Sequence, residues 1–82
     1  MLILNQKKDE LYDINNIWVD KYRIFTTQNN KNIELGLYKS IHDTKKAFEI
    51  ILETIQEQQE EQQNNKIIEM PQKEEIDWKE EI

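Results

Sequence analysis

The sequence predicts a small α+β domain in which an antiparallel sheet of about three to five strands packs against one amphipathic helix. Three observations lead to this prediction. Short apolar and polar runs alternate up to residue 38, apolar side chains recur at helical spacing over residues 41–55, and 82 residues form one domain at most. We expect one domain over residues 1–71, with its strands between about 2 and 38, and an acidic tail over residues 72–82.

Short apolar runs predict the strands. LILNQ, residues 2–6, is expected to form an edge strand, and Asn15-Asn16 predicts a turn or bulge because asparagine tolerates left-handed backbone geometry. Residues 22–27 and 33–38 alternate in character on either side of QNNKN, which is typical of a β-hairpin. Gly36, the only glycine, lies inside the second of these strands and indicates a bulge or a close backbone approach.

A helix is expected from about residue 41 to residue 60. Ser40 can accept a hydrogen bond from an amide of the first turn, and Asp43 suits the positive end of the helix. The apolar stripe, with Ala47 and Ile50 at its margins, would lie on one face of the sheet. Its members are Ile41, Phe48, Ile51, Leu52 and Ile55.

The segment after Ile55 has two possible structures. Residues 56–65 contain good helix formers but no apolar side chain, so the helix either continues into solvent or ends in a linker. We favour an extension of one or two turns. KIIEM, residues 66–70, predicts a short strand that ends at Pro71 and returns to a sheet edge of the same subunit or of a neighbour.

The chain combines a neutral body with an acidic tail. Residues 1–55 contain eight Lys/Arg and eight Asp/Glu, whereas residues 56–82 contain three and nine, which accounts for the net charge of −6. No cluster of cations can displace counterions from a phosphate backbone, so direct binding of DNA or RNA is not expected. The absence of cysteine, of a secretory leader and of an apolar stretch of membrane-spanning length leads us to expect a cytoplasmic protein without a membrane partner.

The side chains that enzymes need are scarce. One histidine, His42, rules out a two-histidine metal site and is expected to be a solvated helix residue, and one glycine rules out a phosphate-binding glycine loop. The acidic pairs Glu60-Glu61 and Glu74-Glu75 lie on polar stretches, whereas paired catalytic carboxylates need a shielded site. We therefore expect no enzyme, no catalytic residue, no metal and no cofactor.

One group of residues is a candidate ligand site. Trp18, Lys21, Tyr22 and Arg23 combine aromatic faces with cations, which can hold a nucleotide by stacking and by contacts with phosphate. The simpler alternative is that the two aromatic side chains pack beneath the helix and that the cations are solvated.

A second group is a candidate partner site in the acidic tail. Ile76, Trp78 and Ile82 are spaced apolar side chains, which can anchor an acidic segment in a groove of a partner protein. The alternatives are that Trp78 docks on its own domain, or that the tail only increases solubility.

The order of the motifs is informative as a whole. ILNQ at residues 3–6, IELGLYKS at 33–40, KKAFEIILETI at 45–55 and IIEMP at 67–71 follow one another along the chain. This order resembles a family of small proteins encoded by phages and prophages of low-GC Gram-positive bacteria. SIHDTKK is about three residues longer than the usual junction of that family, and IIEMP lacks its aromatic residue. The resemblance implies a phage context and no established activity.

That context implies a class of function. Small non-enzymatic phage proteins often antagonise host immunity by stoichiometric binding, and a chain this short has a marginal core that favours self-association. We expect a homo-oligomer whose subunit interfaces sequester a host immune signalling nucleotide. The alternatives are an anti-CRISPR-like inhibitor whose acidic tail blocks a basic cleft of a host nuclease or defence effector, and a phage accessory protein without defence activity.

Overall fold

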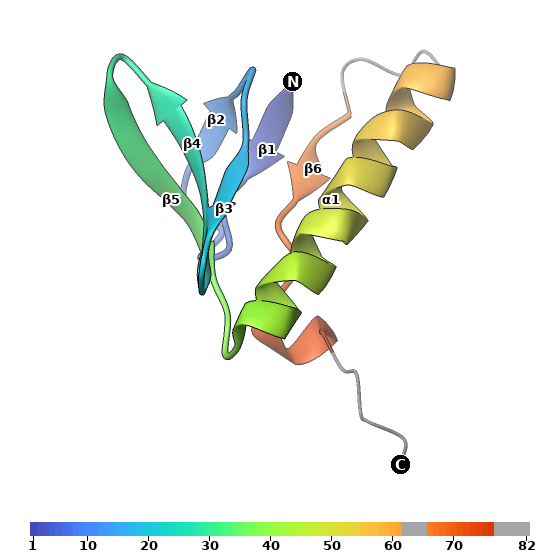
Figure 1. Cartoon of the computed structure of the whole chain (residues 1–82). Helices are drawn as coiled ribbons and strands as arrows, with labels where there is room; N and C mark the ends of the chain where they lie inside the picture. Colours follow the sequence, from blue (N-terminus) through green and yellow to red (C-terminus); the bar gives the residue numbers. More distant parts are fainter. Residues whose placement is uncertain (62–65, 77–82) are drawn as a thin grey trace.

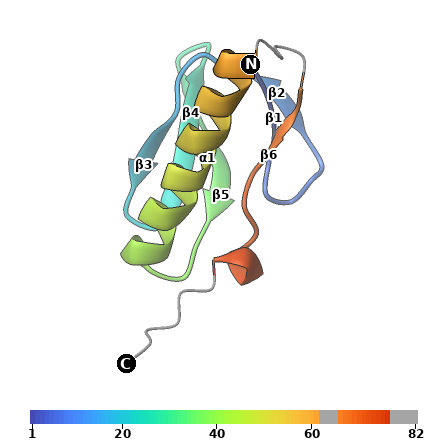
Figure 2. The ribbon, with the colours of Figure 1, turned by 90° about the vertical axis from the view of Figure 1, so that its right-hand side faces the viewer.

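A single long helix, α1 (Ile41–Glu61), packs against two three-stranded sheets in the computed structural model, which describes residues 1–61 and 66–76 (Figure 1). The helix contacts strands of both sheets. Seen from the helix side, α1 crosses in front of one sheet, and the other sheet lies beside it (Figure 2). The predicted α+β class and the predicted helix are confirmed.

The first sheet joins the two ends of the described chain. Its strand order is β2 (Leu11–Asp13), β1 (Leu2–Leu4) and β6 (Ile68–Glu69). Strand β1 is antiparallel to β2 and parallel to β6. The prediction of an edge strand over residues 2–6 was therefore wrong, because the returning β6 of the same chain makes β1 the central strand. The predicted return of KIIEM to a sheet is confirmed.

The second sheet is an antiparallel meander. Its strand order is β3 (Trp18–Asp20), β4 (Arg23–Gln28) and β5 (Lys31–Leu37). The predicted hairpin of β4 and β5 is confirmed, and its turn residues Asn29 and Asn30 both have positive φ angles, 51° and 65°.

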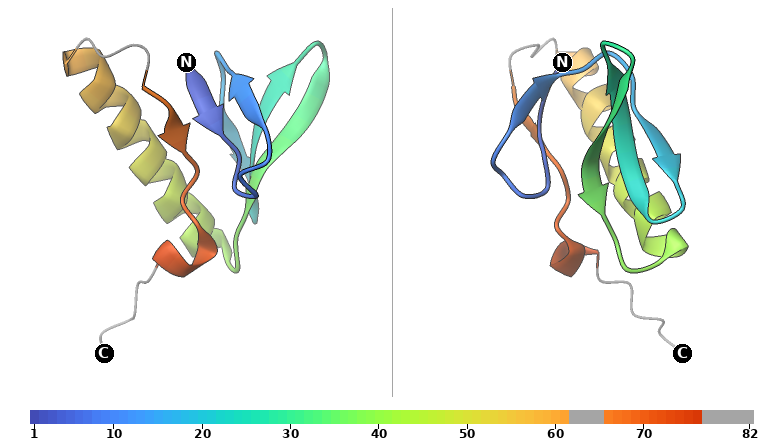
Figure 3. Two further views of the ribbon diagram at one scale, coloured as in Figure 1. Left: turned by 180° about the vertical axis from the view of Figure 1, so that it is seen from behind. Right: turned by 90° about the vertical axis from the view of Figure 1, so that its left-hand side faces the viewer.

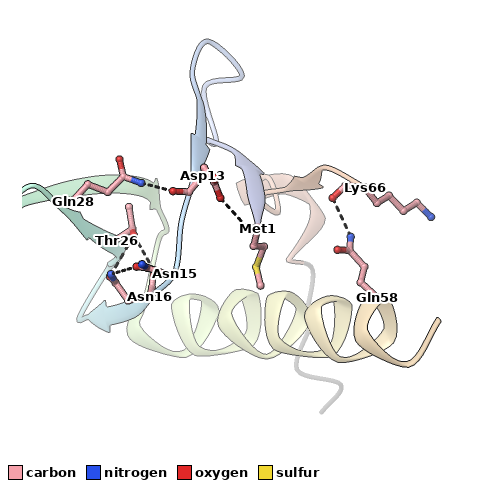
Figure 4. Close-up of polar contacts among 8 residues, drawn as sticks. All are labelled: Met1, Asp13, Asn15, Asn16, Thr26, Gln28, Gln58 and Lys66. Carbon is pink, nitrogen blue, oxygen red and sulfur yellow. Dashed lines mark hydrogen bonds and ion pairs between the residues drawn. The ribbon is translucent and has the colours of Figure 1, made fainter. Parts of the chain in front are cut away.

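The Asn15-Asn16 pair forms the link between the two sheets. Asn16 accepts a hydrogen bond from the Thr27 amide at 2.8 Å and donates one to the Thr27 carbonyl at 3.0 Å, as a neighbouring strand would do. Thr26 donates to the Asn16 carbonyl, and Gln28 donates to the Asp13 carbonyl (Figure 4). The link therefore fixes the position of β2 relative to β4.

The core lies where α1 faces both sheets. Ser40 caps the helix, since its Oγ accepts from the Asp43 amide at 3.0 Å, as predicted. The most buried helical positions are Thr44, Ala47 and Ile51, so the helix is rotated relative to the predicted stripe. The buried apolar residues are Ile3, Ile14, Ile24, Leu35, Tyr38, Ala47, Ile51, Ile68, Met70 and Ile76.

Gln6 connects the two sheets. Its amide donates to the Leu35 carbonyl at 2.8 Å, and its side-chain oxygen accepts from the Leu37 amide at 2.9 Å. Its side-chain nitrogen donates to the Pro71 carbonyl at 3.3 Å, and its own carbonyl accepts from the Gln72 side chain at 2.9 Å. One glutamine thus holds β5 and the C-terminal segment at the end of β1.

The region around Gly36 is tightly packed. A Cβ atom at Gly36 would lie 3.0 Å from Met70 Cε and 3.0 Å from the Tyr38 hydroxyl. The register of β4 and β5 also shifts between Ile24 and Phe25, opposite this region. The predicted bulge or irregularity near Gly36 is confirmed by the register shift. The atoms that approach Gly36 closely belong to the side chains of Met70 and Tyr38 and not to another backbone segment.

The packed body extends beyond Pro71. A short 3-10 helix, η1 (Lys73–Glu75), follows, and Ile76 is only 7 % exposed within the core cluster. A boundary drawn at residue 71 would therefore remove a core residue.

Candidate functional site

The outer face of the β3-β4-β5 sheet carries a pair of stacked aromatic rings. Ile24 and Thr26 of β4 are fully buried on the helix side, so the intervening Phe25 points to the opposite face. Trp18 is paired with Phe25 in the register of β3 and β4, and their ring centroids lie 4.6 Å apart with an interplanar angle of 22°. Figure 3 shows this sheet from its outer side, with α1 behind it.

The indole of Trp18 is held in place from the strand beside it. Its Nε1 atom donates a hydrogen bond of 3.0 Å to the Thr27 hydroxyl. β3 is the edge of its sheet in the described part of the chain, so no strand covers Trp18 on the side away from Phe25. We call Trp18, Phe25 and Thr27 the aromatic face. A further planar ring that stacked on Trp18 would extend this pair.

The predicted cations lie at one end of this face. Arg23 is paired with Asp20 and lies on the same side of β4 as Phe25. Its Nε is 3.0 Å from a carboxylate oxygen of Glu34 on β5, and the two side chains are 53 % and 42 % exposed. An exposed ion pair of this kind contributes about 0–1 kcal/mol, so an anionic ligand can replace Glu34 at small cost.

Lys21 and Tyr22 form the turn between β3 and β4. Lys21 has a φ of 56°, a left-handed conformation that costs a non-glycine residue about 1–2 kcal/mol. Tyr22 is exposed. The structure therefore brings the four predicted ligand-binding residues together at one end of a hairpin. Neither aromatic side chain lies beneath the helix: Trp18 is on the opposite face, and Tyr22 is in the turn.

A polar cleft adjoins the aromatic face. It has a volume of about 720 Å³ and lies between the β1–β2 loop, the outer side of β5 and the segment around η1. Its charged lining consists of Lys7, Lys73, Asp9, Glu10, Glu34 and Glu74. Carboxylates outnumber ammonium groups there, so the cleft disfavours phosphate but can accept hydrogen bonds from hydroxyl or amine groups.

Asn5 shapes one wall of the cleft. Its side-chain oxygen accepts from the amides of Asp9 at 3.1 Å and Glu10 at 3.2 Å, and its side-chain nitrogen donates to Asp9 at 2.9 Å. Sequence reasoning missed this site. The only signal for it was the polar pair Asn5-Gln6 at the end of an apolar run.

A second apolar surface lies on the first sheet. Ile3 of β1 is buried, so Leu2 and Leu4 point to the outer side, where Leu4 is paired with Leu11. Leu11 and Ile67, which precedes β6, are among the exposed large apolar residues. Figure 3 shows this sheet in its left view. We call Leu2, Leu4, Leu11 and Ile67 the aliphatic patch.

The predicted tail site is only partly described. Ile76 packs into the core of its own domain, so it does not present a surface anchor, contrary to the expectation. Trp78 and Ile82 lie outside the described residues.

Two further observations concern metals and membranes. Among residues 1–61 and 66–76, no group of three or more His, Cys, Asp or Glu side chains is placed to hold a metal ion. In the same part of the chain, no helix has both the length and the apolar character required to cross a bilayer.

Comparisons of the chain with models of protein families, with curated proteins and with solved structures found no match.

Proposed function

We propose that the protein is a non-enzymatic, phage-encoded binding protein that self-associates and sequesters a signalling nucleotide in the cytoplasm of the host, and so antagonises antiviral defence. The stacked pair of Trp18 on the edge strand β3 and Phe25 on the central strand β4, at the outer face of the sheet, carries the proposal. A nucleobase that stacks on Trp18 gains about 1–3 kcal/mol, whichever base it is.

The surroundings of the stack supply the other parts of a nucleotide site. Lys21 and Arg23 lie at the end of the hairpin, where they can neutralise phosphate. The cleft beside Glu34 is lined by carboxylates that can accept hydrogen bonds from sugar hydroxyls. The base, phosphate and sugar of a nucleotide therefore each have a chemically suitable neighbour.

Calorimetry of the full chain against a panel of cyclic and ADP-ribose-type nucleotides tests the proposal. We expect at least one nucleotide to bind, and the Trp18→Ala variant to lose that heat. Ile67→Ala, which removes an exposed side chain from the other sheet, is the matched control and should bind normally. Absence of heat for every nucleotide would overturn the proposal.

Fluorescence provides a second readout at the site itself. The chain has two tryptophans, so a Trp78→Phe variant leaves Trp18 as the only indole. A stacked base should quench its emission in proportion to the bound fraction.

The aliphatic patch favours a second candidate, a direct protein inhibitor. Asp13, which pairs with the Met1 ammonium group, and Glu69 lie at the same outer face. The patch is therefore apolar with a carboxylate at Glu69 on its margin, which suits a partner with a basic group at its rim. A chain that ends at Ile76 keeps the core residue. If the acidic tail blocks the partner, this chain should no longer protect phage on a defended host, whereas a protein that sequesters a nucleotide should still protect it after the same truncation.

A third candidate is a phage accessory protein without defence activity. Phage with and without the gene should then grow equally well on a defended host.

A further inference from the structure

One flank of α1 leaves large apolar side chains in solvent. Ile41 and Leu52 are each 45 % exposed, whereas Thr44, Ala47 and Ile51, which face the sheets, are buried. Phe48 and Ile55 lie on the same flank and are only partly buried against the core. We call Ile41, Phe48, Leu52 and Ile55 the helix flank.

The spacing of the residues along this flank matches the seam of two helices packed as a coiled coil. With Lys45 and Gln59, its members follow one another at alternating intervals of four and three residues. This is the repeat by which two helices interlock side chains along a shared seam. Phe48 and Ile55 are partly covered by their own domain, whereas Ile41 and Leu52 are not.

The charges of α1 are segregated along its length. The first half is neutral, because Asp43 and the exposed Glu49 balance Lys45 and Lys46. The second half contains no cation, and its exposed residues Glu53, Glu57 and Glu60 are acidic. Two parallel copies would oppose the acidic second halves of the two helices to each other. Two antiparallel copies would oppose the lysines of each helix to the carboxylates of the other.

The aliphatic patch is less suited to a second copy. Its margin carries Glu69 and also Asp13, whose carboxylate pairs with the Met1 ammonium group at 2.8 Å. A symmetric pairing would bring Glu69 toward the acidic margin of the second copy. An antiparallel pairing of the helix flank therefore keeps the acidic halves apart, whereas a symmetric pairing of the aliphatic patch brings Glu69 toward an acidic margin.

We infer that two copies of the chain form a symmetric dimer through the helix flank, with their α1 helices antiparallel. This inference specifies the self-association included in the proposed function. It is independent of any ligand, because the aromatic face lies on the opposite side of the β3-β4-β5 sheet from α1.

Analytical ultracentrifugation of the full chain and of two variants tests the interface. Leu52→Glu should weaken the dimer by more than about 100-fold, because each dimer loses two apolar contacts. Ile50→Glu changes a side chain that is 37 % exposed on the same helix but off the flank, so it should remain dimeric. Circular dichroism of both variants should show unchanged helix content.

The orientation has its own test. The chain contains no cysteine, so single cysteines at Lys45 and at Glu60 can be oxidised without interference. The two positions are about 22 Å apart along the helix. Neither variant should cross-link to itself, but a mixture of the two should form a heterodimer. Self-cross-linking of both variants would indicate parallel helices and overturn the inference.

A monomeric full chain, or equal weakening by Leu52→Glu and Ile50→Glu, would also overturn it. Nucleotide binding by a monomeric Leu52→Glu variant would separate the two proposals, since the interface would then be absent and the aromatic face still functional.

Discussion

The hydroxyl of Tyr38 donates a buried hydrogen bond of 2.7 Å to the carbonyl oxygen of Pro71. The same carbonyl accepts from the Gln6 side chain at 3.3 Å. The end of β5, the end of β1 and the C-terminal segment therefore meet at a single acceptor. Gln6 and Tyr38 therefore stabilise the fold through hydrogen bonds, although no hydrophobic periodicity in the sequence indicates this role.

Replacing Tyr38 by phenylalanine should destabilise the protein by about 1–2 kcal/mol, because the Pro71 carbonyl keeps only its longer hydrogen bond. Urea unfolding followed by circular dichroism measures this change. Tyr22→Phe, at an exposed position, is the matched control and should change stability little. Equal stability of Tyr38→Phe and the wild type would contradict a structural role for the hydroxyl.

Stability should also decrease in alkaline solution. Burial raises the pKa of the Tyr38 hydroxyl above its ordinary value of 10.0, and the charge of Glu75 adds to the rise. The folded state therefore holds this proton more tightly than the unfolded chain, and the associated stability is complete below pH 10.0 and lost as the pH rises above it. Tyr38 contributes a slope of up to about 1.4 kcal/mol per pH unit. Above pH 10.0, the free energy of unfolding should decrease more steeply with pH for the wild type than for Tyr38→Phe. Urea unfolding at several pH values measures this difference.

A Gly36→Ala substitution should cost about 1–3 kcal/mol of stability, because the added methyl group meets Met70 and Tyr38 at 3.0 Å. Gly36 does not have a positive φ, so the cost is steric. Adding Met70→Leu removes the Cε atom and should recover part of the loss. Simple additivity of the two substitutions in thermal unfolding would show that Met70 is not the obstacle.

Lys21→Gly should separate stability from ligand binding. Glycine relieves the left-handed strain at φ 56° and should raise stability by about 0.5–1 kcal/mol, but loss of the ammonium group should weaken nucleotide binding. Lys8→Gly relieves the same kind of strain, at φ 63° in the β1–β2 loop, and should leave affinity unchanged. Both variants can be followed by thermal unfolding and calorimetry. Equal nucleotide affinities of Lys21→Gly and Lys8→Gly would show that Lys21 does not contribute to binding.

The local elements of the fold could be predicted from sequence, and their assembly could not. Alternation over β4 and β5, the Asn29-Asn30 turn and the Ser40 cap are short-range signals that were interpreted correctly. The division into two sheets depends on β6 pairing with β1 from the far end of the chain. No periodicity in the sequence encodes that pairing.

The candidate site shows the same contrast: residues that are close in sequence could be grouped, but the cleft could not be predicted. Trp18, Lys21, Tyr22 and Arg23 are close in sequence, so one hairpin was enough to bring them together. The cleft needed Asn5, Glu34 and Lys73 from three distant segments, and only the folded chain brings them together. The outward direction of Trp18 had a signal: Ile17 and Val19 on either side of it are both packed against the core.

The parallel pairing of β1 with β6 has a consequence for biosynthesis. Residues 2–4 leave the ribosome early, but their second neighbour is made only after the whole helix has been translated. The central strand of the first sheet must therefore wait, with one side unpaired, until β6 has been translated. A protease that cleaved the nascent chain after α1 would leave β1, the first strand to be made, without β6 beside it.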